Sequence, residues 1–113
     1  MHELSLIQDT LVLATQQARQ AGGQRIHRVM MRIGPLSGVV SETLQFAFDV
    51  LKKDTIAAEA TLEIESVSVR CYCQRCASDF SPADLICECP ICHEISTDLR
   101  SGREVELTSL EVS

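Results

Sequence analysis

Apolar residues recur every three or four positions near the start of the chain, which is the spacing of one face of an α-helix. The stripe runs through Leu4, Ile7, Leu11, Ala14 and Ala18. The pair Gly22-Gly23 follows, where a helix commonly ends in a left-handed residue. The pattern predicts a first helix that ends just before these glycines and turns one apolar face to a core.

Apolar and polar residues then alternate over positions 27–33, which is the period of a half-buried strand. The predicted strand ends before Pro35, because proline cannot donate to a sheet ladder. Its apolar face would hold His27, Val29, Met31 and Ile33. We therefore expect His27 to be a core histidine with its hydrogen bonds satisfied.

A second helix is predicted after Ser41, a good N-cap residue, with Leu44, Ala47, Phe48 and Leu51 on its buried face. Positions 61–69 and 104–112 read as two more strands. The apolar phase of the former shifts near Ser66, which a bulge or a change of burial would explain. The predicted fold class is α/β (α+β), with two helices packed on a three-stranded sheet.

Residues 70–97 break this pattern, since they contain all six cysteines and offer little core. The sequence predicts a discontinuous α/β domain of residues 1–69 plus 98–113. Residues 70–97 would form an inserted domain of the zinc-ribbon type.

The cysteines form two Cys-x-x-Cys pairs, Cys73–Cys76 and Cys89–Cys92, separated by twelve residues. Two such turns supply four thiolates for a tetrahedral Cys₄ site, and zinc suits soft thiolates without requiring a ligand-field geometry. A thiol oxidoreductase predicts one such pair in a βαβ setting, and iron–sulfur ligation is a further alternative. We expect structural zinc at Cys73, Cys76, Cys89 and Cys92.

Cys71 and Cys87 are left over, because the pattern Cys-x-Cys-x-x-Cys occurs twice. One interpretation makes them small buried hydrophobic residues, and this one we favour. Another makes them a redox-sensitive pair or alternative zinc ligands. The duplication leaves both the register of the ligand set and the role of this pair open.

Charge and composition narrow the function classes. The 113 residues include 10 basic and 16 acidic side chains, a net charge of −6, so a nucleic-acid partner is not expected. No apolar run approaches the roughly 18 residues of a membrane span, and the first residues lack the features of a signal peptide. We expect a cytoplasmic protein without a membrane partner.

The N-terminus offers a second metal site. The amine of Met1 with the backbone nitrogen and imidazole of His2 can close fused chelate rings around one ion. Ni²⁺ and Cu²⁺ favour the resulting tetragonal or square-planar geometry. A plain exposed terminal histidine is the alternative. His93 follows a cysteine ligand and is expected to lie in the turn around the zinc, with ligation of a metal as the alternative.

Several segments together resemble the HypA/HybF family of nickel metallochaperones for [NiFe]-hydrogenase maturation. They are Met1-His2-Glu3-Leu4-Ser5, Arg32-Ile33-Gly34 with Leu36-Ser37, Leu44-Gln45-Phe46-Ala47-Phe48-Asp49, and Cys89-Pro90-Ile91-Cys92-His93 beside the other Cys-x-x-Cys pair. The similarity runs in the same order over essentially the whole chain.

The resemblance implies nickel bound as cargo at His2, with Met1 and Glu3 close by, and structural zinc at the four Cys-x-x-Cys thiolates. It implies a HypB-type GTPase and the hydrogenase large-subunit precursor as partners, and no catalytic activity. In some members the chemistry also serves urease, and a homodimer is a further expectation. Where many relatives carry an acidic residue before the second helix, Glu42 is the nearest substitute here. The competing hypothesis is a zinc-ribbon adaptor without a nickel function.

Overall fold

A computed structural model describes residues 2–113 of the chain, with side chains from Glu3 onward. Two helices, a short 3₁₀ helix (η1) and six strands follow one another along the described residues. Their bounds are α1 His2–Gln20, β1 Ile26–Ile33, η1 Pro35–Ser37, α2 Ser41–Leu51, β2 Thr61–Ser66, β3 Arg70–Cys73, β4 Ser78–Phe80, β5 Asp98–Ser101 and β6 Val105–Val112.

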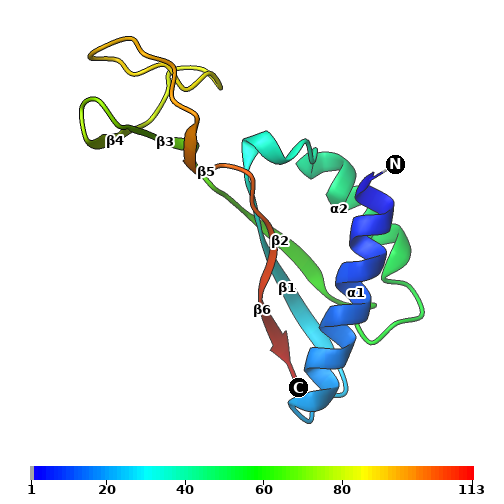
Figure 1. Ribbon diagram of the computed structural model, residues 1–113. Helices are drawn as coiled ribbons and strands as arrows, with labels where there is room; N and C mark the ends of the chain where they lie inside the picture. The colour runs from blue at the N-terminus through cyan, green and yellow to red at the C-terminus, as the bar shows by residue number, and fades with distance from the viewer. Residues whose placement is uncertain (1) are drawn as a thin grey trace.

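The first sheet has the order β2-β1-β6, and α1 and α2 cover one of its faces (Figure 1). β1 and β2 are parallel, so the chain must cross over between them, and α2 lies on that crossover. β6 returns from the far end of the sequence to pair antiparallel with β1. The predicted layout of two helices on a three-stranded sheet is therefore confirmed. We call this body the α/β unit.

The core of the α/β unit forms where the helices meet the sheet. Its fully buried large side chains come from both layers, with Ile7 and Phe48 from the helices and Val29 and Met31 from β1. The stripe predicted on α1 is buried from Ile7 onward, but Leu4 is 41% exposed. Glu3 takes the inward position in the first turn and is only 9% exposed.

His27 is exposed, so the prediction of a core histidine was wrong. The pairing of β1 with β6 shifts register between Ile26 and Arg28. The irregularity turns His27 outward and puts Ile26 into the core instead. One ring nitrogen of His27 lies 2.7 Å from the hydroxyl of Ser113.

Two local predictions also need correction. Val40, not Ser41, is the N-cap residue of α2, and it makes no side-chain cap hydrogen bond. Of the two explanations for the apolar phase shift near Ser66, the change of burial holds and the bulge does not, because β2 ends there. Beyond that point Val67 still donates its N–H to the Ile33 carbonyl, and its side chain is buried.

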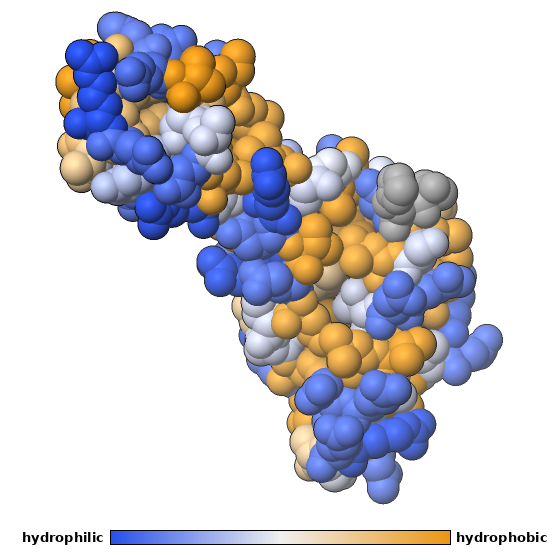
Figure 2. Space-filling model, viewed as in Figure 1, coloured by the Kyte–Doolittle hydropathy of each residue, from blue (hydrophilic) through white to orange (hydrophobic). Residues whose placement is uncertain are grey.

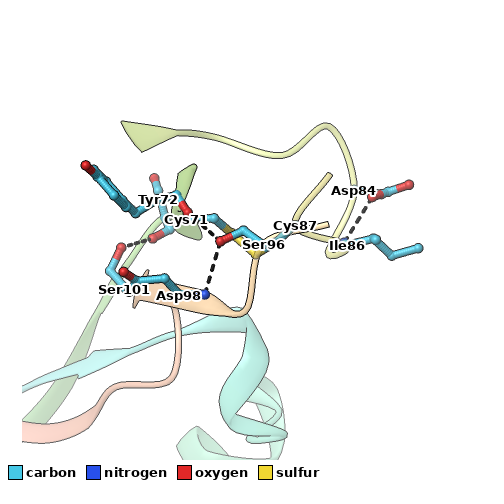
Figure 3. Close-up of a disulfide and its surroundings, with 9 residues drawn as sticks. Cys71, Tyr72, Asp84, Ile86, Cys87, Ser96, Asp98 and Ser101 are labelled. Atoms are coloured by element: carbon cyan, nitrogen blue, oxygen red, sulfur yellow. Dashed lines mark hydrogen bonds between the residues drawn. A yellow bond between two sulfur atoms is a disulfide. The ribbon is translucent and has the colours of Figure 1, made fainter. Parts of the chain in front are cut away.

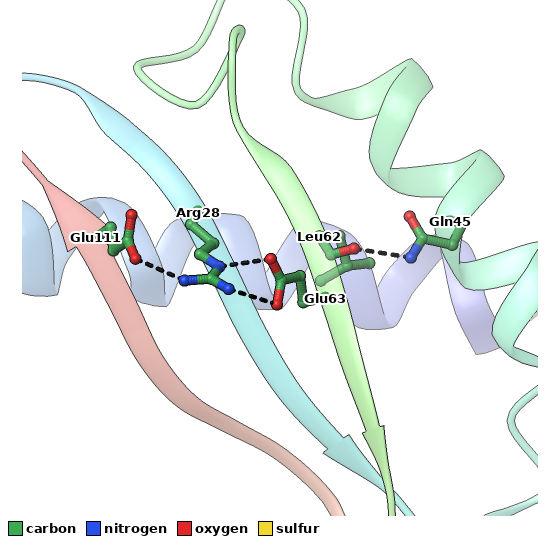
Figure 4. Close-up of polar contacts among 5 residues, drawn as sticks. All are labelled: Arg28, Gln45, Leu62, Glu63 and Glu111. Atoms are coloured by element: carbon green, nitrogen blue, oxygen red, sulfur yellow. Dashed lines mark hydrogen bonds and ion pairs between the residues drawn. The ribbon is translucent and has the colours of Figure 1, made fainter.

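Charged residues cover the sheet face that the helices leave open (Figure 4). Arg28 of β1 donates to both carboxylate oxygens of Glu63 on β2, at 2.5 and 2.8 Å. It also donates to Glu111 of β6 at 2.7 Å. These bonds to the guanidinium lower the pKa of Glu63 and raise that of Arg28. The three strands are thus linked by charge on one face and by the apolar core on the other.

The second sheet has the order β4-β3-β5 and holds the cysteines. We call residues 70–101 the cysteine unit. It extends away from the α/β unit, and the whole chain measures 54 × 27 × 16 Å (Figure 1). The domain boundaries at 69/70 and 97/98 stay a prediction, and the hydrogen-bonded sheet runs on to Ser101.

The connection from β5 to β6 passes close to the turn after β1 at a pair of glycines, Gly102 and Gly34. Leu36 donates its N–H to the Gly102 carbonyl at 2.7 Å, and Gly34 donates to Glu104 at 2.8 Å. A Cβ on Gly34 would lie 2.1 Å from the Gly102 oxygen. Only a glycine permits this approach. None of the helices in the described part of the chain is long and apolar enough to cross a membrane.

Candidate metal centres

Two tight turns present the four cysteines of the Cys-x-x-Cys pairs. Cys73 ends β3, and the N–H of Cys76 points at its sulfur at 3.4 Å. In the second turn His93 donates its N–H to the Cys89 carbonyl at 2.9 Å. Ala77 and His93, each just after the second cysteine of its pair, have positive φ angles of 54° and 64°. The two turns therefore have similar backbone conformations, which bring the two sulfurs of each pair close together.

The four sulfurs of Cys73, Cys76, Cys89 and Cys92 all lie within 4.8 Å of one another. Sγ–Sγ distances across the two turns are 3.5 Å for Cys73–Cys92 and 3.8 Å for Cys76–Cys89. A regular Zn–S tetrahedron with bonds of about 2.3 Å has edges of roughly 3.8 Å. The donor set and its spacing therefore fit zinc, and the side chains that would hold it are buried or half-buried.

The electrostatics of the cluster show why it suits a cation. Removal from water and hydrogen bonds with the neighbouring thiols raise the pKa of Cys76 to about 12. Backbone N–H groups of Cys92 and Ile91 lower the pKa of Cys89 to about 6. Packed sulfurs thus resist being charged together unless a cation lies between them. A divalent metal would supply that charge and displace protons as it binds.

His93 lies in the second turn, as expected, and it is not one of the four residues whose donor atoms gather there. Nδ1 lies 3.2 Å from a carboxylate oxygen of Glu88, and the side chain is exposed. A second ion pair, Arg75 with Glu94 at 3.5 Å, joins the two turns on the outside. These partly solvated pairs close the rim of the cluster and contribute little to its stability.

Cys71 and Cys87 form a disulfide, with their Cα atoms 6.0 Å apart (Figure 3). Cys71 is fully buried, as the favoured interpretation expected, but the bond supports the alternative of a redox-sensitive pair. Both cysteines are then removed from the set of available zinc ligands. The pairing could not be read from spacing, although the duplicated Cys-x-Cys-x-x-Cys pattern marked these two residues as equivalent.

The N-terminal site is described from Glu3 onward. Met1 lies outside the described residues, and His2 is described only as the first residue of α1. A carboxylate oxygen of Glu3 accepts the N–H of Val40 at 3.2 Å. This bond ties the first turn of α1 to the start of α2. The sequence alone did not indicate it, because the two residues are far apart in the chain. Glu42 lies exposed in the first turn of α2.

A family model described as "Hydrogenase/urease nickel incorporation, metallochaperone, hypA" matches residues 1–112. A hydrogenase maturation factor HypA of a Picosynechococcus species is 46% identical over 112 residues, covering 99% of both chains. A HypA of Geotalea uraniireducens is 37% identical over 112 residues, again covering 99% of both.

Solved structures are similar as well. The solution structure of the Ni metallochaperone HypA from Helicobacter pylori has a TM-score of 0.72 and 28% identity, and the match covers 99% of this chain and 97% of that one. Another solution structure of a HypA protein has a TM-score of 0.76 and 28% identity, with 100% and 97% covered.

Proposed function

The chain belongs to the HypA family of hydrogenase/urease nickel incorporation metallochaperones, and from this premise we propose that it binds Ni(II) through Met1, His2 and Glu3 and delivers it for [NiFe]-hydrogenase maturation. The family is one of maturation factors, not enzymes. The observation that carries the proposal is the match to a nickel-incorporation family over residues 1–112, with Met1-His2-Glu3 at its start.

The start of α1 supports a chelate of this kind. The first four N–H groups of an α-helix have no partner within the helix. Because α1 begins at His2, the backbone nitrogens of His2 and Glu3 are among them. Either can lose its proton to a metal without breaking a helical hydrogen bond. The contact between Glu3 and Val40 holds the Glu3 end of this first turn against α2, so that the backbone nitrogen of Glu3 is positioned before an ion arrives.

Zinc is proposed as a structural ion at Cys73, Cys76, Cys89 and Cys92. The fit of their sulfurs to a thiolate tetrahedron supports this ligand set. The ion would hold the two turns together in a unit with a small apolar core. Cargo and structural metal would then bind to different units of the protein, which lets one ion leave while the other stays.

The nickel proposal is tested by isothermal titration of Ni²⁺ into untagged protein at two pH values. We expect His2→Ala, and a form with one extra N-terminal residue, to lose nickel binding and keep zinc. His27→Ala is the matched control, since His27 is an exposed histidine of the same unit. Affinity should rise with pH, because the imidazole (pKa about 6.5) and the amine (about 8) must both be deprotonated. Equal affinity in wild type and His2→Ala would reject the chelate.

As a maturation factor, the protein works with the hydrogenase maturation machinery. We propose a HypB-type GTPase and the large-subunit precursor as specific partners, a cytoplasmic location and a homodimer. Gln16 and Arg19 are exposed on α1 beside the exposed Val12, and they offer a docking surface on the unit that would carry the nickel site, so that metal could pass directly between the proteins. Gln16→Glu with Arg19→Glu should weaken binding of the GTPase and leave metal content unchanged. If only changes in the cysteine unit did so, the docking surface would lie there.

A zinc-ribbon adaptor remains the second candidate, favoured by one observation. The cysteine unit exposes four aliphatic side chains, Leu85, Ile86, Ile91 and Ile95. Exposed apolar residues gathered on a small unit are typical of a protein-binding surface. This candidate predicts that His2→Ala leaves hydrogenase maturation intact, whereas Ile91→Asp abolishes it. The chaperone proposal predicts loss of maturation with His2→Ala.

A further inference from the structure

The disulfide of the cysteine unit lies beside the proposed zinc ligands in both turns. Cys71 precedes Cys73 by two residues, and Cys87 precedes Cys89 by two. The bond therefore joins the two arms that carry the Cys-x-x-Cys pairs, just outside the sulfur cluster. Any change in this bond acts on both halves of the zinc site at once.

The two ends of the bond lie in different surroundings (Figure 3). Cys71 is in the middle of β3, fully buried, and paired with Phe80 of β4 and Leu99 of β5. Cys87 is half-buried at the end of the long loop after β4, and its carbonyl accepts the N–H of Ser96 at 2.7 Å. The bond thus ties the end of the loop after β4 to the central strand of the second sheet.

Few other described contacts do the same for this segment. The N–H of Ile86 bonds to Asp84 within the loop at 3.0 Å, and that of Glu88 bonds to Ile86. Glu88 also forms an isolated bridge with Ile95. These bonds are local to the second turn, whereas the Ser96 hydroxyl donates to the Tyr72 carbonyl of β3 and Arg75 pairs with Glu94 across the two turns. The disulfide is therefore the strongest described link between the second Cys-x-x-Cys pair and β3 when no metal is bound.

We propose that Cys71 and Cys87 are a reversible dithiol–disulfide site that sets how tightly the cysteine unit retains its zinc. When the bond is present, it keeps the two Cys-x-x-Cys turns adjacent and removes two thiols that could replace ligands in the duplicated pattern. When it is reduced, the turns separate more easily and the extra thiols offer zinc an exit by ligand exchange.

The exchange balances with a small disulfide such as oxidised glutathione. Its S–S bond accepts two electrons, the two cysteine thiols give up two protons, and two glutathione thiols are released as the Cys71–Cys87 bond forms. A dithiol protein of the thioredoxin type would carry out the reverse. It would attack at Cys87, because that sulfur belongs to a half-buried residue whereas Cys71 is fully buried. In a reducing compartment the bond would be transient.

The test uses the zinc-loaded, full-length protein, incubated with either reduced or oxidised glutathione. Peptide mass spectrometry should find Cys71 linked to Cys87 in the oxidised sample, with zinc retained. Transfer of zinc to a chromophoric chelator should then be about tenfold slower than from the reduced sample. A Cys71→Ala/Cys87→Ala variant should show one rate under both conditions. The wild-type comparison needs no variant to fold.

Three outcomes would overturn the proposal: six free thiols after oxidation, zinc expelled with linkage among the four proposed ligands, or equal transfer rates in both states. The inference rests on the proposed zinc site but not on the nickel site. Nickel titration of the same samples therefore separates the two. If nickel does not bind but the redox effect on zinc transfer is seen, only the chaperone proposal is contradicted. If nickel binds but the redox effect is missing, only the proposal for Cys71 and Cys87 is contradicted.

Discussion

The α/β unit and the cysteine unit each contain a three-stranded sheet, but different forces hold them together. The α/β unit buries a cluster of fourteen residues, including Phe48, Ile7 and Met31. The buried cluster of the cysteine unit has four members besides the adjoining Val69, and three of these four are cysteines: Cys71, Cys73 and Cys89. A unit this small buries too little apolar surface to offset chain entropy, so cross-links or a metal must supply the rest.

Exposure of apolar side chains differs between the units in the same way. In the α/β unit such residues line a groove between α1 and β6, with Leu13, Leu107 and Leu110, and Figure 2 shows apolar surface on this side of the unit. In the cysteine unit the aliphatic residues that could have built a core, such as Ile91, lie outside instead. Their exposure indicates that cysteines have replaced apolar packing at the centre of this unit.

The largest difference between the two units is expected when the proposed zinc ligands are removed. Cys73→Ala, or a strong chelator, should unfold the cysteine unit and leave the α/β unit folded, since structural zinc contributes on the order of 10 kcal/mol. Amide NMR spectra with zinc analysis would show the loss confined to residues 70–101. Gln74→Ala, an exposed residue of the first turn outside the disulfide, is the control and should keep zinc. A full zinc equivalent in a Cys73→Ala/Cys76→Ala variant would instead assign ligands to Cys71 and Cys87.

The converse change is made in the apolar core. Phe48→Ala should destabilise the α/β unit by about 3–5 kcal/mol, because Phe48 is fully buried between the layers. Urea unfolding followed by helical circular dichroism measures this. Phe46→Ala, on the exposed side of α2, is the control and should cost less than about 0.5 kcal/mol. Loss of zinc from Phe48→Ala under conditions where it stays folded would contradict the independence of the two units.

Between the units, Gly34→Ala should destabilise by about 1–3 kcal/mol, because its Cβ would overlap the Gly102 backbone. Gly38→Ala separates steric overlap from backbone strain, which are the two reasons why a position requires glycine. Gly38 has open space around it but a φ of +80°, so only conformational strain of about 1 kcal/mol is expected. Thermal unfolding of both variants checks the order. A larger effect at Gly38 would show that the close approach of Gly34 to Gly102 can relax.

A smaller effect is expected from backbone strain in the turns that carry the cysteines. Ala77→Gly should stabilise the zinc-loaded cysteine unit by up to about 1 kcal/mol, because Ala77 has a φ of +54° that alanine disfavours. The chelator concentration that removes half the zinc should rise. Ala83→Gly, in the exposed loop of the same unit, should lower it slightly. If both changes lowered it, strain at the turn would not limit zinc retention.

The smallest effect concerns the charged face of the α/β unit. The pKa of Glu63 is lowered by Arg28, so its ionised form is favoured in the folded state. This stabilisation is complete above the unfolded value of about 4.3 and is lost as pH falls through the lower folded value. Urea midpoints of wild type and Glu63→Gln should therefore converge at acid pH. Glu59 is an exposed carboxylate outside this network, so the difference in urea midpoint between wild type and Glu59→Gln should not change with pH.

Regular elements could be predicted wherever one periodicity ran without interruption. The stripe from Ile7 to Ala18 and the alternation from Val29 to Ile33 both appear as buried faces. His27 failed because the register shift between Ile26 and Arg28 depends on β6, which lies more than seventy residues away. The N-cap of α2 failed because a suitable side chain at Ser41 does not place the backbone, which begins the helix one residue earlier than that pattern implied.

The sequence by itself determined the two architectures and the family, because periodicity and cysteine spacing are local properties of the chain. Tertiary structure decided which sulfurs meet. The four-sulfur cluster and the Cys71–Cys87 bond both depend on β3 lying against the loop that follows β4. Tertiary structure also decided that Glu3 is buried against Val40. Spacing along the chain determines which nearby residues lie on one face or in one turn. Contacts between distant segments depend on how whole layers pack, which no local pattern encodes.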